Sequence, residues 1–202
     1  MQLLLVSQNK GKITEARRVF SSSDYNLLTL NQTTLLKSLG VKIPAGLIVA
    51  ESGKTFRENA LIKAQAFHQL TQLPCIADDS GLLLDAFPNF PGIDSKRWFK
   101  GNDRDRNLAL LKKLKNVKNR QAIFQTVLCL FAFKKDKALF FLGEVKGKIA
   151  FESKGKDGLG YDPIFIPEGY QESFAQLGLA VKSKISHRAL AWKSLLNYLE
   201  KN

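Results

Sequence analysis

The feature that most restricts how this chain folds is the order of the apolar segments along its sequence. A buried strand is expected over Leu3–Val6, a helix over Lys12–Phe20 and a second strand over Tyr25–Leu30. Farther along, Ala122–Phe133 and Ala138–Val145 are typical of a long antiparallel pair. Strand–helix alternation followed by long strands predicts a mixed α/β fold, with two lobes and a central cleft.

Helix start signals add two further elements. The segment Thr55–Glu58 has the pattern of a capping box and predicts a helix that runs to about Gln69. Asn102 or Asp103 is expected to cap another helix, which continues through Leu114.

The 202 residues of the chain suit one domain or two closely joined lobes with a sizeable buried core. We therefore treat residues 1–202 as a single domain of two lobes. Met1–Val6 has no basic leader and too short an apolar run for a signal peptide. Ala122–Phe133 is too short to cross a membrane. These features predict a soluble, cytoplasmic protein with no membrane partner.

A formal net charge of +13 indicates an anionic partner, which is nucleic acid, a membrane surface or a phosphorylated small molecule. Part of this charge lies between Lys112 and Arg120, where a solvated helix face is the ordinary explanation. A nucleic-acid-binding module is the main alternative from another class of protein. The chain has no helix-turn-helix, RRM or zinc-finger pattern, so no specific nucleic-acid partner is expected.

Sulfur and imidazole ligands for a metal are not expected. Cys75 and Cys129 lie in apolar runs without a CxxC partner, and His68 and His187 are far apart in sequence. A metal bound here would have oxygen ligands, which predicts a hard cation such as Mg²⁺.

A candidate phosphate site lies where the first strand meets the first helix. Backbone N–H groups at a helix start, a glycine and two lysines suit phosphate oxygens. The pattern differs from the GxxxxGK[ST] loop, and a plain polar loop is the alternative. The candidate residues are Ser7, Gln8, Asn9, Lys10, Gly11 and Lys12.

The helix after Thr55 carries a lysine within an apolar stripe. The apolar members of that stripe are Phe56, Ala60, Ala64 and Phe67. Lys63 lies among them, and a buried ammonium is costly unless it meets an anion. The alternative is that Lys63 extends to water at the edge of the stripe. Glu51, the nearest acidic residue upstream, is a possible metal ligand.

Two adjacent carboxylates, Asp78 and Asp79, end the apolar strand Pro74–Asp78. Such a pair suits Mg²⁺ binding or general-base activation of water. Successive strand residues face opposite ways, so a turn at Ser80-Gly81 is needed to bring both carboxylates to one cleft. The alternative is a helix cap or turn aspartate.

Two later motifs complete the set of candidates. In Gly158–Pro163, glycines allow close approach to a ligand and Tyr161 offers an aromatic face, although an ordinary turn has the same pattern. In Lys182–Arg188, cationic groups crowd the start of a last helix capped by Ser186, which favours an anionic or carbonyl-bearing ligand over a solvated basic patch.

Taken together, these segments resemble the inosine/xanthosine triphosphate pyrophosphatase family. The motifs that carry the resemblance are SQNKGK, ESGKTFRENALIKA, IADDSGL, PGIDSKRW, GLGYDPIF and KSKISHRA, in the order of that family, from Ser7 to Arg188. The resemblance implies two α/β lobes around a long mixed sheet, usually as a homodimer. It also implies hydrolysis of non-standard purine nucleoside triphosphates to the monophosphate and pyrophosphate.

The resemblance also implies roles for residues. Glu51 and Asp79 would bind Mg²⁺, with Asp79 as the catalytic proton acceptor and with Asp78 and Lys63 in support. The segment Ser7–Lys12 would hold phosphates. The remaining contacts to base, sugar and phosphates would come from Ser80, Leu159, Gly160, Tyr161, Asp162, Lys182, His187 and Arg188.

Two positions depart from the pattern of the family. Leu159 stands where a phenylalanine is usual, which removes one aromatic surface for the purine, and Asp94 stands where a tyrosine or similar residue is usual. A related enzyme class, the septum-inhibitor-type pyrophosphatases that act on pyrimidine nucleotides, is the second alternative. The SHR and GYDP motifs argue against it.

Overall fold

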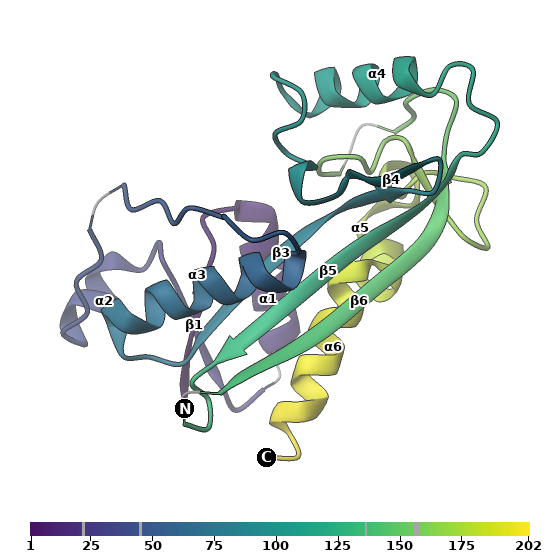
Figure 1. The fold of residues 1–202 in the computed structure, drawn as a ribbon. Coiled ribbons are helices and arrows are strands. Elements are labelled where there is room, and N and C mark those ends of the chain that lie inside the picture. The colour runs from purple at the N-terminus through teal and green to yellow at the C-terminus, as the bar shows by residue number, and fades with distance from the viewer. Residues whose placement is uncertain (22, 45, 136, 156–157) are drawn as a thin grey trace. The chain divides into compact units, whose positions relative to one another are not determined.

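The computed structural model describes residues 1–21, 23–44, 46–135, 137–155 and 158–202. They form two compact units. Unit 1 comprises Met1–Asp79, Val127–Leu142 and Ala191–Asn202, and unit 2 comprises Ser80–Thr126 and Gly143–Leu190. The elements, drawn in Figure 1, are β1 (Gln2–Val6), α1 (Lys10–Phe20), β2 (Asn26–Thr29), α2 (Thr33–Ser38), α3 (Phe56–Thr71), β3 (Cys75–Leu84), β4 (Phe87–Pro91), the 3₁₀ helix η1 (Gly92–Asp94), α4 (Asp103–Lys113), β5 (Gln121–Phe131), β6 (Ala138–Ile149), β7 (Phe165–Pro167), α5 (Phe174–Ile185) and α6 (His187–Leu199).

The described strands form one seven-stranded sheet in the order β2-β1-β3-β5-β6-β7, with β4 paired to β3. β1 is parallel to both β2 and β3, whereas β4 is antiparallel to β3 and β7 is antiparallel to β6. The sheet is therefore mixed, and the predicted α/β class is confirmed. The long strands β5 and β6 are neighbours, as the sequence predicted.

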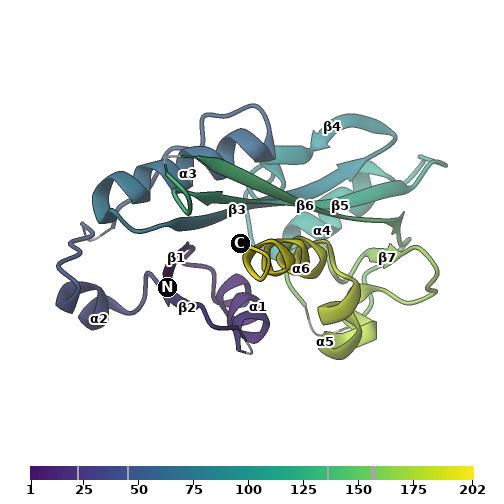
Figure 2. The same cartoon turned by 90° about the horizontal axis from the view of Figure 1, so that it is seen from below.

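Unit 1 has helices on both faces of its strands, because alternate strand residues point to opposite sides. Leu3, Leu5 and Ile76 pack with α1 and α6, whereas Leu4 and Ala77 pack with α3. Figure 2 shows α3 and α1 on opposite sides of these strands. Each face of the unit 1 strands thus has its own apolar core.

Unit 2 has a third core, formed by β3, β5, α4 and the start of α5. Its centre is aromatic: Phe124 lies 4.7 Å from Phe165, measured between ring centroids, and Phe165 stacks on Phe174 at 5.4 Å. Tyr161, Leu82 and other apolar residues complete this core.

The prediction of a short strand followed by a turn was wrong for residues 74–81. β3 continues without interruption from Cys75 to Leu84 and includes Ser80 and Gly81. Both residues take up the extended backbone of β3, a strand that lies between β1 and β5 in the sheet. The sequence did not predict α2, β4, β7 or α5.

The capping box predicted at Thr55–Glu58 is half formed. The hydroxyl of Thr55 accepts a hydrogen bond from the amide of Glu58 at 3.1 Å. The carboxylate of Glu58 binds the amide of Lys54 at 2.6 Å instead of that of Thr55. Of the two predicted caps of α4, Asn102 is the one observed, and it forms a complete capping box with Asp105.

We expect Arg120→Met to lower the stability of unit 2. Arg120 is buried, and its guanidinium donates to the carbonyls of Ile149 at 2.8 Å, Leu114 at 2.9 Å and Ala150 at 2.6 Å. Leaving these carbonyls without a donor costs at least about 2 kcal/mol. Thermal unfolding should show a midpoint lower by about 4 °C or more, with the exposed Arg104→Met as control. Equal midpoints for the two variants would contradict this account.

Candidate active site

The continuous course of β3 places the two adjacent carboxylates on opposite faces. Along this strand, Ile76 packs with α1 and α6, and Ala77 packs with α3. Asp78 therefore faces α1, where its carboxylate lies 2.8 Å from Lys12 Nζ. Asp79 faces α3, where its carboxylate contacts Asn59 and Lys63. The expectation that a turn brings both carboxylates to one place is incorrect.

Lys63 is the centre of the cluster on the α3 side. Its ammonium donates to Glu51 Oε1 at 2.6 Å and to the backbone carbonyl of Asp78 at 2.7 Å, and lies 3.6 Å from Asp79 Oδ1. The sequence left two environments open for Lys63, contact with an anion or extension to water. The structure shows that it meets two carboxylates, and its side chain is only 14% exposed.

Burial opposes ionisation of Asp79. Loss of solvent raises the pKa of its carboxyl above the ordinary value, and the negative charge of Glu51 raises it further. Lys63, Lys12 and the amide of Asn59 act in the opposite direction without cancelling the rise. Lys63 itself has a raised pKa, because the attraction of Asp79, Asp78 and Glu51 outweighs its own burial. The site thus disfavours the ionised form of Asp79 and favours the protonated form of Lys63.

Asn59 belongs to this cluster, although the sequence analysis did not place it among the candidate site residues. It is fully buried, its Nδ2 donates to Asp79 Oδ2 at 3.2 Å, and its Oδ1 accepts from the amide of Gly53 at 2.9 Å. A β-carbon at Gly53 would lie 2.8 Å from that oxygen, so the close approach requires glycine. The available signal was the position of Asn59 one helical turn before Lys63.

The segment Ser7–Lys12 has a different arrangement from the predicted cradle of free amides. Asn9 caps α1, and its Oδ1 accepts from the amides of Gly11 at 2.9 Å and Lys12 at 3.2 Å. The amide of Asn9 binds Ser7 Oγ at 3.2 Å. Because these amides have partners, the exposed side chain of Lys10 remains a more available phosphate contact.

In unit 2, the segment Gly158–Asp162 is a tightly bound turn. Asp162 Oδ2 accepts from the amide of Leu159 at 2.7 Å. Tyr161 is buried, and its hydroxyl donates to the carbonyl of Ser95 at 2.5 Å and accepts from Trp98 Nε1 at 2.6 Å. Burial raises the pKa of Tyr161 to about 12. Tyr161 is therefore a support of the turn, and the predicted exposed aromatic face is not observed.

The cationic residues from Lys182 to Arg188 do not all crowd one helix start, as the sequence predicted. Lys182 and Lys184 lie in the last turn of α5, where the helix dipole favours positive charge. Lys182 is buried and lies 2.5 Å from Asp162 Oδ2. Only His187 and Arg188 lie at the start of α6, and Ser186 binds the amide of Ala189 there at 3.2 Å.

His187 and Arg188 have separate partners in unit 2. The ring of His187 stacks on Phe124, with 4.6 Å between centroids and 12° between planes. Arg188 donates to Ser80 Oγ at 3.2 Å. The structure thus brings together two predicted substrate contacts, Arg188 and Ser80, and it adds Phe124, which the sequence analysis did not identify.

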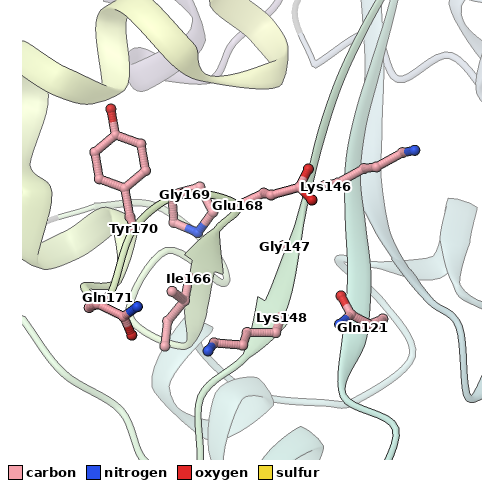
Figure 3. A pocket seen from close by; sticks show the side chains of 10 residues that line it. Gln121, Lys146, Gly147, Lys148, Ile166, Glu168, Gly169, Tyr170 and Gln171 are labelled. Atoms are coloured by element: carbon pink, nitrogen blue, oxygen red, sulfur yellow. The ribbon is translucent and has the colours of Figure 1, made fainter.

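A separate pocket of about 340 Å³ lies in unit 2. Figure 3 shows its lining side chains, which come from β6, from the segment around β7 and from the start of β5. The lining residues are Gln121, Lys146, Gly147, Lys148, Ile166, Pro167, Glu168, Gly169, Tyr170 and Gln171. This set contains none of the residues that the sequence analysis assigned to substrate or metal.

The donor atoms of the α3-side cluster fit a hard divalent cation. Glu51 and Asp79 both contact the same ammonium group, so two carboxylates already converge on one positive charge. Mg²⁺ in enzymes is commonly held by one or two carboxylates together with substrate phosphates. Within the described ranges, no group of three or more His, Cys, Asp or Glu side chains is arranged to hold a metal ion.

Comparison with known proteins places the chain in a family. A model of the Ham1 family matches residues 3–198. The chain belongs to the Ham1 family. A dITP/XTP pyrophosphatase from Acholeplasma laidlawii is 41% identical over 90% of this chain and 91% of that protein. A dITP/XTP pyrophosphatase from Aquifex aeolicus is 35% identical over 99% of this chain and 97% of that protein.

Solved structures of Ham1 proteins have the same fold. A HAM1 protein from Coxiella burnetii superposes with a TM-score of 0.86 at 32% identity and covers 100% of both chains. The Ham1 protein of Staphylococcus aureus superposes with a TM-score of 0.85 at 33% identity, over 100% of this chain and 99% of that one. The resemblance inferred from the sequence motifs is confirmed.

Asp94, the residue expected to depart from the sequence pattern of the family, is exposed in η1 of this Ham1-family chain. Its carboxylate accepts from Arg97 Nε at 2.6 Å. Among the helices that the structure describes, none is long and apolar enough to span a lipid bilayer.

Proposed function

We propose that this protein hydrolyses non-standard purine nucleoside triphosphates, namely ITP, dITP and XTP, and thereby removes them from the nucleotide pool. A water oxygen bonds to the α-phosphorus, and the bond from that phosphorus to the bridging oxygen breaks. The products are the nucleoside monophosphate and pyrophosphate, and the water proton goes to a base.

The observation that carries this proposal is the membership of the chain in the Ham1 family over residues 3–198. Relatives named dITP/XTP pyrophosphatase match nearly the full length of the chain. The carboxylate–lysine cluster around Asp79 supports the assignment, since phosphoryl transfer depends on positioning and on charge stabilisation.

We assign the acid–base and phosphate chemistry to residues of unit 1. We assign Asp79 as the proton acceptor; burial raises the pKa of its carboxyl, which makes the carboxylate a stronger base than an exposed aspartate. Lys63, held by Glu51 and the Asp78 carbonyl, presents a protonated amine to phosphate oxygens. Asp78 acts on the phosphates indirectly, since its carboxylate Oδ2 holds the ammonium of Lys12 at 2.8 Å.

We further propose that Glu51 and Asp79 bind Mg²⁺. When bound, the cation neutralises phosphate charge and lowers the pKa of an attacking water. For Lys63, this assignment implies an exchange of partners, since its ammonium now contacts both carboxylates. We also propose that the protein is a cytoplasmic homodimer and that residues 1–202 form one catalytic domain. These proposals rest on the resemblance in sequence.

Base recognition is assigned to unit 2, and it yields a prediction about selectivity. His187 and Arg188 are hydrogen-bond donors suited to the 6-carbonyl of inosine and xanthosine, whereas adenine has a donor at that position. Unpaired buried groups cost about 1–3 kcal/mol each, so kcat/KM should be roughly 10- to 100-fold higher for ITP than for ATP by the same free-energy conversion. A panel of nucleotides, assayed for phosphate with and without added pyrophosphatase, measures this ratio.

The same panel tests the reaction. Release of phosphate only after pyrophosphatase is added supports cleavage to pyrophosphate. Orthophosphate as the first product, or equal kcat/KM for ATP and ITP, would overturn the proposal. Retention on heparin without any nucleotide turnover would favour the alternative of a nucleic-acid-binding protein.

Leu159→Phe is expected to tighten substrate binding. Leu159 is 41% exposed, and a phenylalanine there would offer a ring face to the purine. Stacking on an aromatic ring contributes roughly 1–3 kcal/mol per base in nucleic-acid binders. We therefore expect a lower KM for ITP with little change in kcat, measured by steady-state kinetics. A higher KM would show that the turn has adapted to leucine.

A further inference from the structure

Helix α4 holds both backbone polar groups of Gly160. Asp103 Oδ2 accepts from the amide of Gly160 at 2.8 Å, and Asn107 Nδ2 donates to its carbonyl at 3.0 Å. Asp103 and Asn107 are one helical turn apart and share a face of α4. Gly160 has φ +61°, a left-handed conformation that glycine adopts easily and that these two contacts fix.

The two side chains that hold Gly160 are themselves held in place. Asn107 is only 3% exposed, and Asp103 is paired with Arg106, which also donates to the carbonyl of Gly101 at 2.7 Å. Helix α4 begins with a complete capping box between Asn102 and Asp105. The contacts to Gly160 therefore come from a firmly anchored end of a helix.

The rest of the turn satisfies its backbone within unit 2. The amide of Asp162 binds the carbonyl of Leu159 at 3.2 Å, and the amide of Ala175 binds the carbonyl of Asp162 at 3.2 Å. Tyr161 and Asp162 are buried, whereas Leu159 is 41% exposed. The backbone from Leu159 to Asp162 is thus hydrogen-bonded both to α4 and within its own segment, and the side chain of Leu159 projects from it.

We propose that Asp103 and Asn107 are positioning residues that fix Gly160, and with it Leu159, and so set the affinity for the purine base of the substrate. This inference rests on the proposed function and deepens it. A turn ordered before the substrate arrives loses little conformational freedom on binding. Without these contacts, the substrate must order the turn itself, so affinity falls. The chemical step, which unit 1 residues carry, changes little.

The first test needs no nucleotide. Hydrogen exchange of the Gly160 amide, followed by NMR in the free protein, is measured for wild type, Asp103→Ala and Asn107→Ala. We expect exchange to become roughly 5-fold faster or more, as loss of one hydrogen bond implies. Asp103→Asn keeps an acceptor oxygen, so the exchange rate of its Gly160 amide should remain near that of wild type. This variant also serves as the test if Asp103→Ala folds poorly. The exposed Leu108→Ala on the same helix is the control.

The second test is kinetic. For Asp103→Ala and Asn107→Ala, KM for ITP should rise about 5-fold, and kcat should stay within about 2-fold. Asp103→Asn should restore KM. A purely structural role would lower the unfolding temperature without this split between KM and kcat.

The outcomes separate the two proposals. If the wild type hydrolyses no nucleoside triphosphate, the proposed function fails, and the exchange experiment still tests the contacts to Gly160. If the wild type is active, unchanged exchange in both alanine variants overturns the positioning role. Faster exchange with unchanged KM overturns it as well.

Discussion

Asp79→Asn should reduce kcat by at least about 100-fold, the low end for loss of a general base. The substitution keeps the shape of a side chain that accepts from Asn59 at 3.2 Å and lies 3.6 Å from Lys63. It removes the charge that accepts a proton and binds metal. Single-turnover kinetics with ITP measure the loss, and circular dichroism checks the fold.

The same variant should not lose stability in metal-free buffer at neutral pH. Burial raises the folded-state pKa of the Asp79 carboxyl, so the ionised form costs folding free energy. That cost is fully present above the folded pKa and absent below the unfolded pKa, so the stability gained by the asparagine should vanish as the pH falls. The exposed Asp24→Asn is the control. Activity within a few-fold of wild type would move the role to another residue, with Asp78 as the next candidate.

Removal of divalent cations should abolish turnover. The only ligands assigned to the cation are oxygens of Glu51 and Asp79, and such a site binds Mg²⁺ weakly enough for a chelator to compete. Exhaustive treatment with EDTA should bring the rate of ITP hydrolysis to background, and added Mg²⁺ should restore it.

The metal assignment has a residue-level check. Glu51→Gln keeps the reach of the side chain but weakens its contact with the cation, so this variant should need more Mg²⁺ for half-maximal activity. The exposed Glu172→Gln should leave the Mg²⁺ requirement unchanged. Full activity after chelation would contradict the assignment of Glu51 and Asp79 as ligands.

The sequence predicted the parts of the fold that depend on local pattern. The strand Leu3–Val6, the helix after Thr55 and the helix capped by Asn102 lie where apolar period and capping residues indicated. The prediction failed at Ser80-Gly81, since these turn-forming residues adopt the extended backbone of β3, which lies inside the sheet between β1 and β5. α5 was missed because Gly178, with φ 72°, interrupts its helical pattern.

The candidate site was predictable in its residues but not in its contacts. The Asp78-Asp79 pair and Lys63 stand out in sequence, because charges in apolar segments are costly without partners. Which charge meets which depends on pairings between residues distant in the chain, such as Lys12 with Asp78 and Lys182 with Asp162. Tyr161 shows the same limit, because its role follows from Ser95 and Trp98.

The alternation along β3 has an evolutionary consequence. A single inserted or deleted residue between Cys75 and Asp79 would exchange the faces of every later side chain in the strand. Asp79 would then point toward α1, and an apolar residue of the core would be turned out with it. Loops tolerate insertions and deletions, whereas a change of length here would move the catalytic carboxylate, so we expect relatives that keep the activity to keep this spacing.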